Sequence, residues 1–179
     1  MSFNPEIQER AFNEIKEIFP TSDFKVEYED LSKLKYLEMI LKETMRFYTT
    51  VPIIGRFVTG ECQLENLNIP AGVCIIIGCY NLHRHKDIWG DDADEYNPDH
   101  FLPEVAEKRH PYSFIPFAGG ARNCIGQKYA MMSMKTMMVH LLRKYRFTTK
   151  LKLNELKYEI QITLKIDKKH MVEVHSREN

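Results

Sequence analysis

The sequence predicts a mainly α-helical fold with small β-sheets. Three segments repeat apolar residues at the spacing of an amphipathic helix, and they begin near Pro5, Asp30 and Ile125. Shorter apolar or alternating runs, bounded by Pro, Gly and Asn, predict strands between the second and third helices and again near the carboxyl end. The chain has 179 residues, 44% of them hydrophobic, so we expect one compact unit or a part of a larger domain.

The first two helices have recognisable starts and stops. Asn4 is placed to cap a helix that begins at Pro5 and stops before Pro20, with apolar residues at positions 7, 11, 15 and 18. Asp30 is placed to cap a second helix, which carries apolar residues at positions 34, 37, 41 and 45 on one stripe and ends near Tyr48. Both helices are therefore expected to bury one face.

The middle of the chain predicts strands followed by a long ordered loop. Pro52 excludes helix, so residues 53–58, 64 and 67–69 are expected to form short strands joined by turns. Val73–Cys79 is apolar almost throughout, which predicts a strand buried on both faces. Residues 81–116 show little periodicity, and we interpret them as a meander with one short helix.

The carboxyl-terminal part predicts a long helix and then a hairpin. Apolar residues share one face from Ile125 to Tyr145, and the methionines at positions 131, 132, 134, 137 and 138 are expected to fill the core. Residues 158–166 alternate between apolar and polar, which predicts a strand. Residues 171–174 are expected to pair with this strand across a turn at positions 167–169.

Composition excludes several classes of function. The 25 Lys and Arg residues balance 25 Asp and Glu residues, so no net field attracts nucleic acid, and no nucleic-acid partner is expected. The sequence has no apolar run that spans a membrane and no targeting signal after Met1. The cysteines lack the paired spacing of a zinc cluster or a disulfide framework, so packing is the simplest role for Cys62, Cys74 and Cys79.

The segment of residues 117–126 concentrates the chemistry. It places Cys124 between a bend and the predicted start of the long helix, where the helix dipole and free backbone N–H groups stabilise a thiolate. Such a sulfur is suited to binding a metal. Phe117 is placed to cover the sulfur side of a flat ligand, and glycines let the backbone approach it: Gly119, Gly120 and Gly126. From the cysteine alone, a buried and inert thiol is the alternative.

This segment matches the signature F-x-x-G-x-R-x-C-x-G at every specified position, so the chain resembles the heme-thiolate monooxygenases of the cytochrome P450 family. The resemblance implies that Cys124 is the catalytic residue and the axial ligand of the heme iron, whose thiolate favours O–O cleavage. It implies that Arg122 binds a heme propionate and that Phe117, Gly119 and Gly126 belong to the heme-binding loop. The implied fold is the C-terminal, proximal heme-binding part of the P450 fold, including the heme-ligand loop and a C-terminal β-hairpin.

Glu43 and Arg46 are three residues apart on the second predicted helix, so their side chains point along one face. Taken alone, the pair is an ordinary solvated ion pair. The P450 family has an E-x-x-R pair on a helix at this place, completed by an arginine from the meander. By that resemblance Glu43, Arg46 and His100 form a buried structural group, and His100 stands where many members have arginine. A neutral histidine would donate a hydrogen bond to Glu43 but add less charge.

Two further polar features invite interpretation. Arg56 matches the position of a second propionate-binding arginine of the family, whereas the alternative is an ordinary exposed arginine. His83-Arg84-His85 suggests metal binding, but two histidines without a third ligand nearby are more often polar loop residues, so we assign no metal there.

The residues around the motifs, at positions 51–56 and 123–127, are most similar to the animal microsomal fourth family, including its insect members. This resemblance implies insertion of one oxygen atom from O2 into lipophilic substrates, whether fatty-acid-like, hormone-like or xenobiotic. The electrons would come from an NADPH-dependent reductase on the proximal face, so NADPH acts only indirectly. The implied location is the cytosolic face of the endoplasmic reticulum membrane.

Full-length family members are far longer. We therefore expect residues 1–179 to be the C-terminal part of one such domain, with the distal helix and the N-terminal membrane anchor outside the chain, so that membrane association occurs only through those parts. The alternative is a truncated, non-catalytic heme-binding or interaction remnant. We also expect a basic docking patch for the reductase, or else a solvated helix end that complements the helix dipole, from Lys128, Arg143, Lys144 and Arg146.

Overall fold

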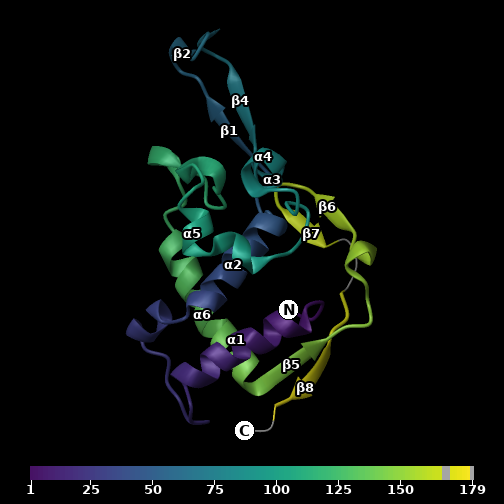
Figure 1. The fold of residues 1–179 in the computed structure, drawn as a ribbon. Coiled ribbons are helices and arrows are strands. Elements are labelled where there is room, and N and C mark those ends of the chain that lie inside the picture. Colours follow the sequence, from purple (N-terminus) through teal and green to yellow (C-terminus); the bar gives the residue numbers. More distant parts are fainter. Residues whose placement is uncertain (167–169, 178–179) are drawn as a thin grey trace.

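The computed structural model describes residues 1–166 and 170–177 and shows a helical body with small sheets around it (Figure 1). This confirms the predicted fold class. The body is built from three long helices: α1 (Pro5–Ile18), α2 (Lys35–Phe47) and α6 (Gln127–Lys144). Shorter helices lie in the connections: η1 (Glu29–Ser32), α3 (Cys79–Leu82), α4 (Lys86–Trp89), η2 (Pro98–Phe101), α5 (Pro103–Ala106), η3 (Pro111–Ser113), η4 (Gly120–Arg122) and η5 (Leu153–Glu155).

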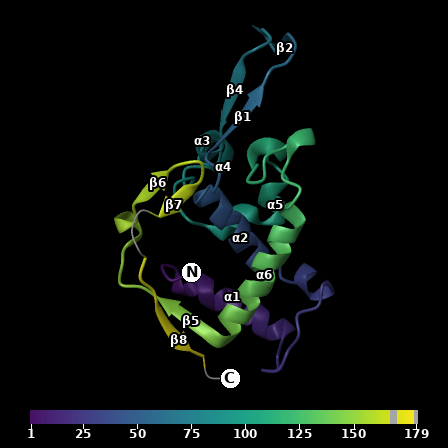
Figure 2. The same ribbon diagram turned by 180° about the vertical axis from the view of Figure 1, so that it is seen from behind.

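The strands form separate antiparallel pairs, each with two strands among the described residues. The pairs are β1 (Ile53–Phe57) with β4 (Cys74–Gly78), β2 (Cys62–Leu64) with β3 (Leu67–Ile69), β5 (Tyr145–Thr148) with β8 (Glu173–Ser176), and β6 (Tyr158–Ile160) with β7 (Leu164–Ile166). The β1–β4 ribbon projects from the helical body and carries β2 near its tip (Figure 1). The β5–β8 ribbon lies beside α1 (Figure 2), where the buried Gln8 side chain hydrogen-bonds both the N–H and the C=O of Phe147.

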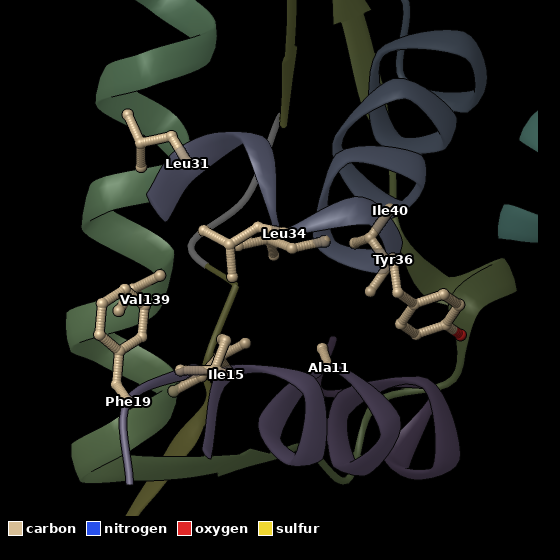
Figure 3. Packing of buried hydrophobic residues seen from close by; sticks show 10 residues of the cluster. Ala11, Ile15, Phe19, Leu31, Leu34, Tyr36, Ile40 and Val139 are labelled. Carbon is tan, nitrogen blue, oxygen red and sulfur yellow. The ribbon is translucent and has the colours of Figure 1, made fainter. Parts of the chain in front are cut away.

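The core lies where the three long helices meet η1 (Figure 3). Its fully buried apolar side chains come from the three long helices and from Leu34 just before α2: Ala11, Ile15, Leu34, Leu37, Val139 and Leu142. Each buried leucine or isoleucine contributes about 1.5–3 kcal/mol relative to exposure. This packing fixes α2 and α6 against each other; α2 carries Glu43 and Arg46, and α6 follows directly after the loop that holds Cys124.

The second helix begins at Lys35 and not after Asp30, so the predicted cap is wrong. Asp30 lies in η1. The free N–H groups of α2 are satisfied by Glu14 of α1, whose carboxylate accepts hydrogen bonds from Tyr36 N at 2.6 Å and Leu37 N at 2.9 Å. A cap from a neighbouring helix leaves no local signature, which explains the error. Helix α1 has the predicted bounds, although Asn4 forms no side-chain cap hydrogen bond.

The predicted strand at residues 73–79 exists as β4, but its burial on both faces is wrong. Ile76 is 64% exposed, and Cys74 is exposed as well, so packing does not explain this cysteine. The strand pairs only with β1 in the described structure, and the ribbon projects away from the core. An apolar run predicts a strand, but it does not specify what covers the strand.

The carboxyl-terminal hairpin is also arranged differently from the prediction. Residues 158–166 form two strands, β6 and β7, that pair with each other, and the predicted single strand is wrong. The last strand pairs with β5 instead. The predicted turn at positions 167–169 lies outside the described residues. Alternation specifies which face of a strand is apolar, but not which strand is its partner.

The meander contains more helical turns than predicted, because Pro98, Pro103 and Pro111 each open one. The methionines of α6 only partly fill the core. Met132 and Met138 pack against the core, whereas Met137 is 54% exposed. In the part of the chain that the structure describes, no helix combines the length and the apolar character needed to cross a membrane.

Candidate functional site

Glu43 and Arg46 form an ion pair at the end of α2 that is completely buried. Arg46 Nε donates to Glu43 Oε2 and Arg46 Nη2 donates to Glu43 Oε1, both at 2.7 Å, and neither side chain is exposed. Such a bidentate pair is among the strongest side-chain interactions available to a protein. It is not the solvated surface pair that the sequence allowed.

The remaining donors of Arg46 hold the meander. They donate to the backbone carbonyls of His83 (2.9 Å), Ala93 (2.6 Å) and Glu95 (2.7 Å). Glu43 Oε1 in turn accepts the N–H of Asn97 at 2.8 Å. One buried pair therefore ties α2 to several separate points of residues 81–116, and this explains how a segment with little regular structure keeps a defined course.

His100 joins this pair from η2. Its Nδ1 lies 3.3 Å from Glu43 Oε1, and its Nε2 lies 3.2 Å from Asp92 Oδ2. The first contact is a hydrogen bond, whereas the second has an ion-pair distance without hydrogen-bond geometry. Burial lowers the pKa of His100, but the hydrogen bond and charge of Glu43, with the help of Asp92, outweigh burial and leave this pKa above its ordinary value.

Sequence reasoning missed several members of this site. Asp92 lies beside the His100 ring, Asn97 O accepts the N–H of His100 at 3.2 Å, and the Trp89 ring packs edge-on against the histidine at 5.9 Å. Their only sequence signal is their position in the meander. His83 contributes in another way, because Nε2 accepts the N–H of Ile115 at 3.0 Å and Nδ1 lies 3.1 Å from Thr49 Oγ1.

His83 is therefore a structural residue. Burial, together with the charges of Arg46 and Arg84, lowers its pKa to about 4, so the ring is neutral at neutral pH. His85, by contrast, lies at the surface, 3.8 Å from Asp87 Oδ2. Among the described residues, no group of three His, Cys, Asp or Glu side chains is arranged to hold a metal ion.

The cysteine loop lies on the surface, just before α6. Cys124 N donates to Phe117 O at 2.9 Å, which closes residues 117–124 into a loop, and Gln127 N donates to Cys124 O at 3.3 Å. Cys124 and Ile125 are exposed, and Phe117 is half-buried. The Cys124 thiol is therefore not buried, in contrast to the alternative that the sequence allowed. Helix α6 begins at Gln127, later than the predicted Ile125.

The glycines of this loop act in different ways. Gly120 has a φ of +73°, in the left-handed region that favours glycine, and Ala118 shares this conformation with a φ of +61°. Gly119 is extended, but a Cβ there would lie 2.8 Å from Tyr112 Cε1. At Gly126 a Cβ would lie 3.7 Å from Cys124 Sγ, an ordinary contact. Among these glycines, Gly119 therefore leaves the least room for a side chain.

We expect Gly119→Ala to destabilise the full-length protein by about 1–3 kcal/mol, because the added methyl group overlaps the Tyr112 ring. Urea unfolding and heme content measure the effect. The double variant Gly119→Ala/Tyr112→Ala removes the obstructing ring and should recover most of the loss. Equal losses in the single and double variants would show that the clash is not the cause. Gly60→Ala, where a Cβ meets nothing within 4 Å, is the matched control.

The two predicted propionate-binding arginines lie in different places. Arg122 is exposed in η4, next to the cysteine loop. Arg56 lies on β1, half-buried, and its Nη1 donates to Gly55 O at 2.9 Å. No described ion pair engages either guanidinium, so both keep donors for an anionic group. Among the described residues, the Arg56 side chain forms no hydrogen bond and no ion pair with the cysteine loop.

The predicted basic patch is partly wrong. Arg143 is 5% exposed, and its Nη2 donates to Thr21 O at 2.9 Å, so this residue serves the fold. Arg146 lies on β5 and not on the helix. Lys128, Lys144 and Arg146 are exposed, but Lys128 is at the cysteine end of α6 and the other two are at its far end. The patch therefore reduces to Lys128 near the cysteine loop.

The signature around the exposed Cys124 and the buried Glu43–Arg46 pair, in a mainly helical body, are the features of this chain that resemble heme-thiolate proteins. The family model for cytochrome P450 matches residues 1–174. The chain therefore belongs to the cytochrome P450 family, whose cofactor is heme.

Curated relatives of this chain include fly and human proteins. A probable cytochrome P450 313a4 of Drosophila melanogaster is 46% identical over 97% of this chain and 35% of its own length. Cytochrome P450 4p1 of the same organism is 40% identical over 99% of this chain and 34% of its own length. Human cytochrome P450 4V2 is 39% identical over 90% of this chain and 31% of its own length. The chain thus spans about a third of the curated relatives that it matches.

A solved structure shows the same fold. The crystal structure of a cytochrome P450DA mutant heme domain superposes with a TM-score of 0.86 at 24% sequence identity. The match covers 98% of this chain and 37% of that heme domain. The arrangement of helices and ribbons described above is therefore that of one part of a P450 heme domain.

Proposed function

We propose that the full-length protein is a heme-thiolate monooxygenase and that residues 1–179 supply its iron ligand and the proximal support of the heme. The observation that carries this proposal is the exposed Cys124, held in a closed loop within a complete heme-thiolate signature. The residues present fit a heme. A thiol suits iron, and nearby Arg122 has donors available for a propionate.

Each site residue has a distinct proposed role. Cys124 donates its thiolate to the iron, and heme so ligated supplies the chemistry of O–O cleavage. Arg122 and Arg56 hold the two propionates by charge-assisted hydrogen bonds. Phe117, Gly119 and Gly126 shape the loop so that the sulfur stays accessible. The group of Glu43, Arg46 and His100 does not touch the reacting atoms. It positions the meander that leads into the loop.

The proposed substrates are lipophilic molecules, with fatty-acid-like compounds first, followed by hormone-like and xenobiotic ones. The similarity to P450 members of the fourth family supports this choice. On the same grounds, the full-length protein is proposed to lie on the cytosolic face of the endoplasmic reticulum, held by an N-terminal segment of the whole protein.

The test uses the full-length protein with an NADPH-dependent reductase, a panel of fatty acids and isotopically labelled dioxygen. A monooxygenase places one labelled oxygen atom in the product and depends on both NADPH and reductase. Heme binding without oxygenated product from any substrate of the panel would overturn the proposed activity and favour the non-catalytic heme-binding alternative.

The reductase is proposed to dock beside the cysteine loop. Lys128 is exposed there, at the edge of a groove of about 670 Å³ that α2, α6 and residues 114–118 line together. An acidic partner would be attracted to this lysine, and this attraction acts mainly on the association rate.

We expect Lys128→Glu in the full-length enzyme to slow reduction several-fold at low salt and to flatten the dependence of the rate on ionic strength. The measurement is the rate of heme reduction by the reductase at increasing salt. Lys144→Glu makes the same charge change at the far end of α6 and should leave the rate unchanged. Equal effects of the two reversals would contradict docking beside the cysteine loop.

A further inference from the structure

His100 lies between two carboxylates that come from different elements. Glu43 of α2 is completely buried, and its Oε1 is 3.3 Å from His100 Nδ1. Asp92, in the turn after α4, is half-exposed, and its Oδ2 is 3.2 Å from His100 Nε2. The histidine side chain itself is only 6% exposed. Both ring nitrogens thus face an acceptor, and water has little access to either.

The charges around the ring favour a cation. Arg46 neutralises Glu43 through two hydrogen bonds, whereas Asp92 receives only a hydrogen bond from Asn97 Nδ2 at 3.3 Å. Arg109, which follows α5, donates to the backbone carbonyl of His100 and stacks over Trp89.

Asp99 of η2 lies 3.5 Å from Arg10 of α1 and forms an ion pair with it, so Arg10 offsets the charge of Asp99. Among these residues, the charge of Asp92 is offset by a cation only when His100 is protonated.

The two protonation states of His100 differ in what they can bind. An imidazolium has two N–H donors and serves Glu43 and Asp92 together. A neutral imidazole has one donor, so one carboxylate would face the lone pair of a ring nitrogen. An arginine in the same place would keep its charge at every physiological pH. The histidine therefore gives this contact a dependence on pH.

We propose that His100 is a pH-sensitive clasp, which holds the meander at residues 97–102 firmly to α2 when its ring is protonated and loosens it when the ring is neutral. His100 is a positioning residue in this role, and the role does not require the proposed activity. It would make the support of the cysteine loop respond to pH in the range where histidine titrates.

The direction of the effect follows from the pKa of His100, which is raised in the folded protein. A raised pKa means that the clasp contributes fully below the unfolded value of about 6.5 and is lost as the pH rises through the folded value. The pKa of Asp92 is shifted as well. Burial raises it, but the close contact with the His100 ring and the hydrogen bond from Asn97 outweigh burial and lower it.

The test is hydrogen–deuterium exchange of the full-length protein, read by mass spectrometry on peptides that cover residues 97–102. His100→Arg is the reference at each pH, because it keeps the charge and cancels the intrinsic pH dependence of exchange. Near pH 6 we expect the two proteins to exchange alike. Near pH 8.5 the natural protein should open more often, by about tenfold for each unit by which folding raises the His100 pKa.

Two variants control the result. His85→Arg changes an exposed histidine, 3.8 Å from Asp87, in the same way and should leave the exchange of residues 97–102 unaltered. Asp92→Asn keeps His100 but removes one of its two carboxylates. It should therefore reduce the increase in exchange of residues 97–102 between pH 6 and pH 8.5. Parallel exchange of the natural protein and His100→Arg from pH 6 to 8.5 would overturn the proposal. Hydrogen–deuterium exchange does not depend on oxygenase activity. A failure of this proposal can therefore be distinguished from a failure of the proposed function.

Discussion

Replacing Glu43 by alanine is expected to destabilise the full-length protein by about 3–5 kcal/mol, the cost of leaving one buried charge without its partner. Arg46 would remain fully buried and would lose both of its hydrogen bonds to carboxylate. The N–H of Asn97 and the ring of His100 would lose their acceptor as well. The loss should therefore exceed that of a typical single substitution.

The measurement is urea unfolding followed by circular dichroism, together with the heme content of the purified protein. Glu27→Ala is the matched control, because this glutamate pairs with Lys25 at the exposed surface and its removal should leave stability nearly unchanged. Similar small effects of both substitutions would show that the Glu43 pair contributes no more than a surface pair.

The second large effect is expected at Cys124. Cys124→Ala removes the only sulfur of the signature loop, and heme retention should fall to a small fraction of that in the natural full-length protein. The variant should nevertheless fold, because the side chain is exposed and the loop is closed by the backbone bond to Phe117 O.

Heme content per protein and circular dichroism measure these two expectations separately. Cys74→Ala removes another exposed cysteine, on β4, and should retain heme. Full heme retention by Cys124→Ala would contradict the assignment. Loss of helical signal would instead identify Cys124 as a structural residue.

Much of the fold could be predicted because local chemistry determines it. The apolar repeat and Pro5 place α1, and the heme-thiolate signature places the cysteine loop before α6. What could not be predicted depends on contacts between distant residues. Glu14 caps α2 from another helix, and β8 pairs with β5, although neither contact leaves a pattern in the sequence. An apolar face in the sequence likewise does not indicate which element covers it, as the exposed Ile76 of β4 shows.

The candidate site shows the same division. Spacing and resemblance placed Glu43 and Arg46 on one helix face, but they did not reveal that Arg46 would bind three backbone carbonyls of the meander. They also suggested that Arg143 belongs to a surface patch, whereas the fold buries it against Thr21. A charge pattern gives the sign of a side chain but not its burial. Asp92, which completes the surroundings of His100, is recognisable only in three dimensions.

The central claim is that the Cys124 thiolate ligates heme iron. Its most direct test is the carbon monoxide spectrum of the reduced full-length protein, compared with that of Cys124→Ser reconstituted with heme. Thiolate ligation gives a characteristic red-shifted band, which we expect in the natural protein and in Cys74→Ala. The band should be absent from Cys124→Ser. Its persistence in Cys124→Ser, or its absence from the natural protein, would contradict the claim.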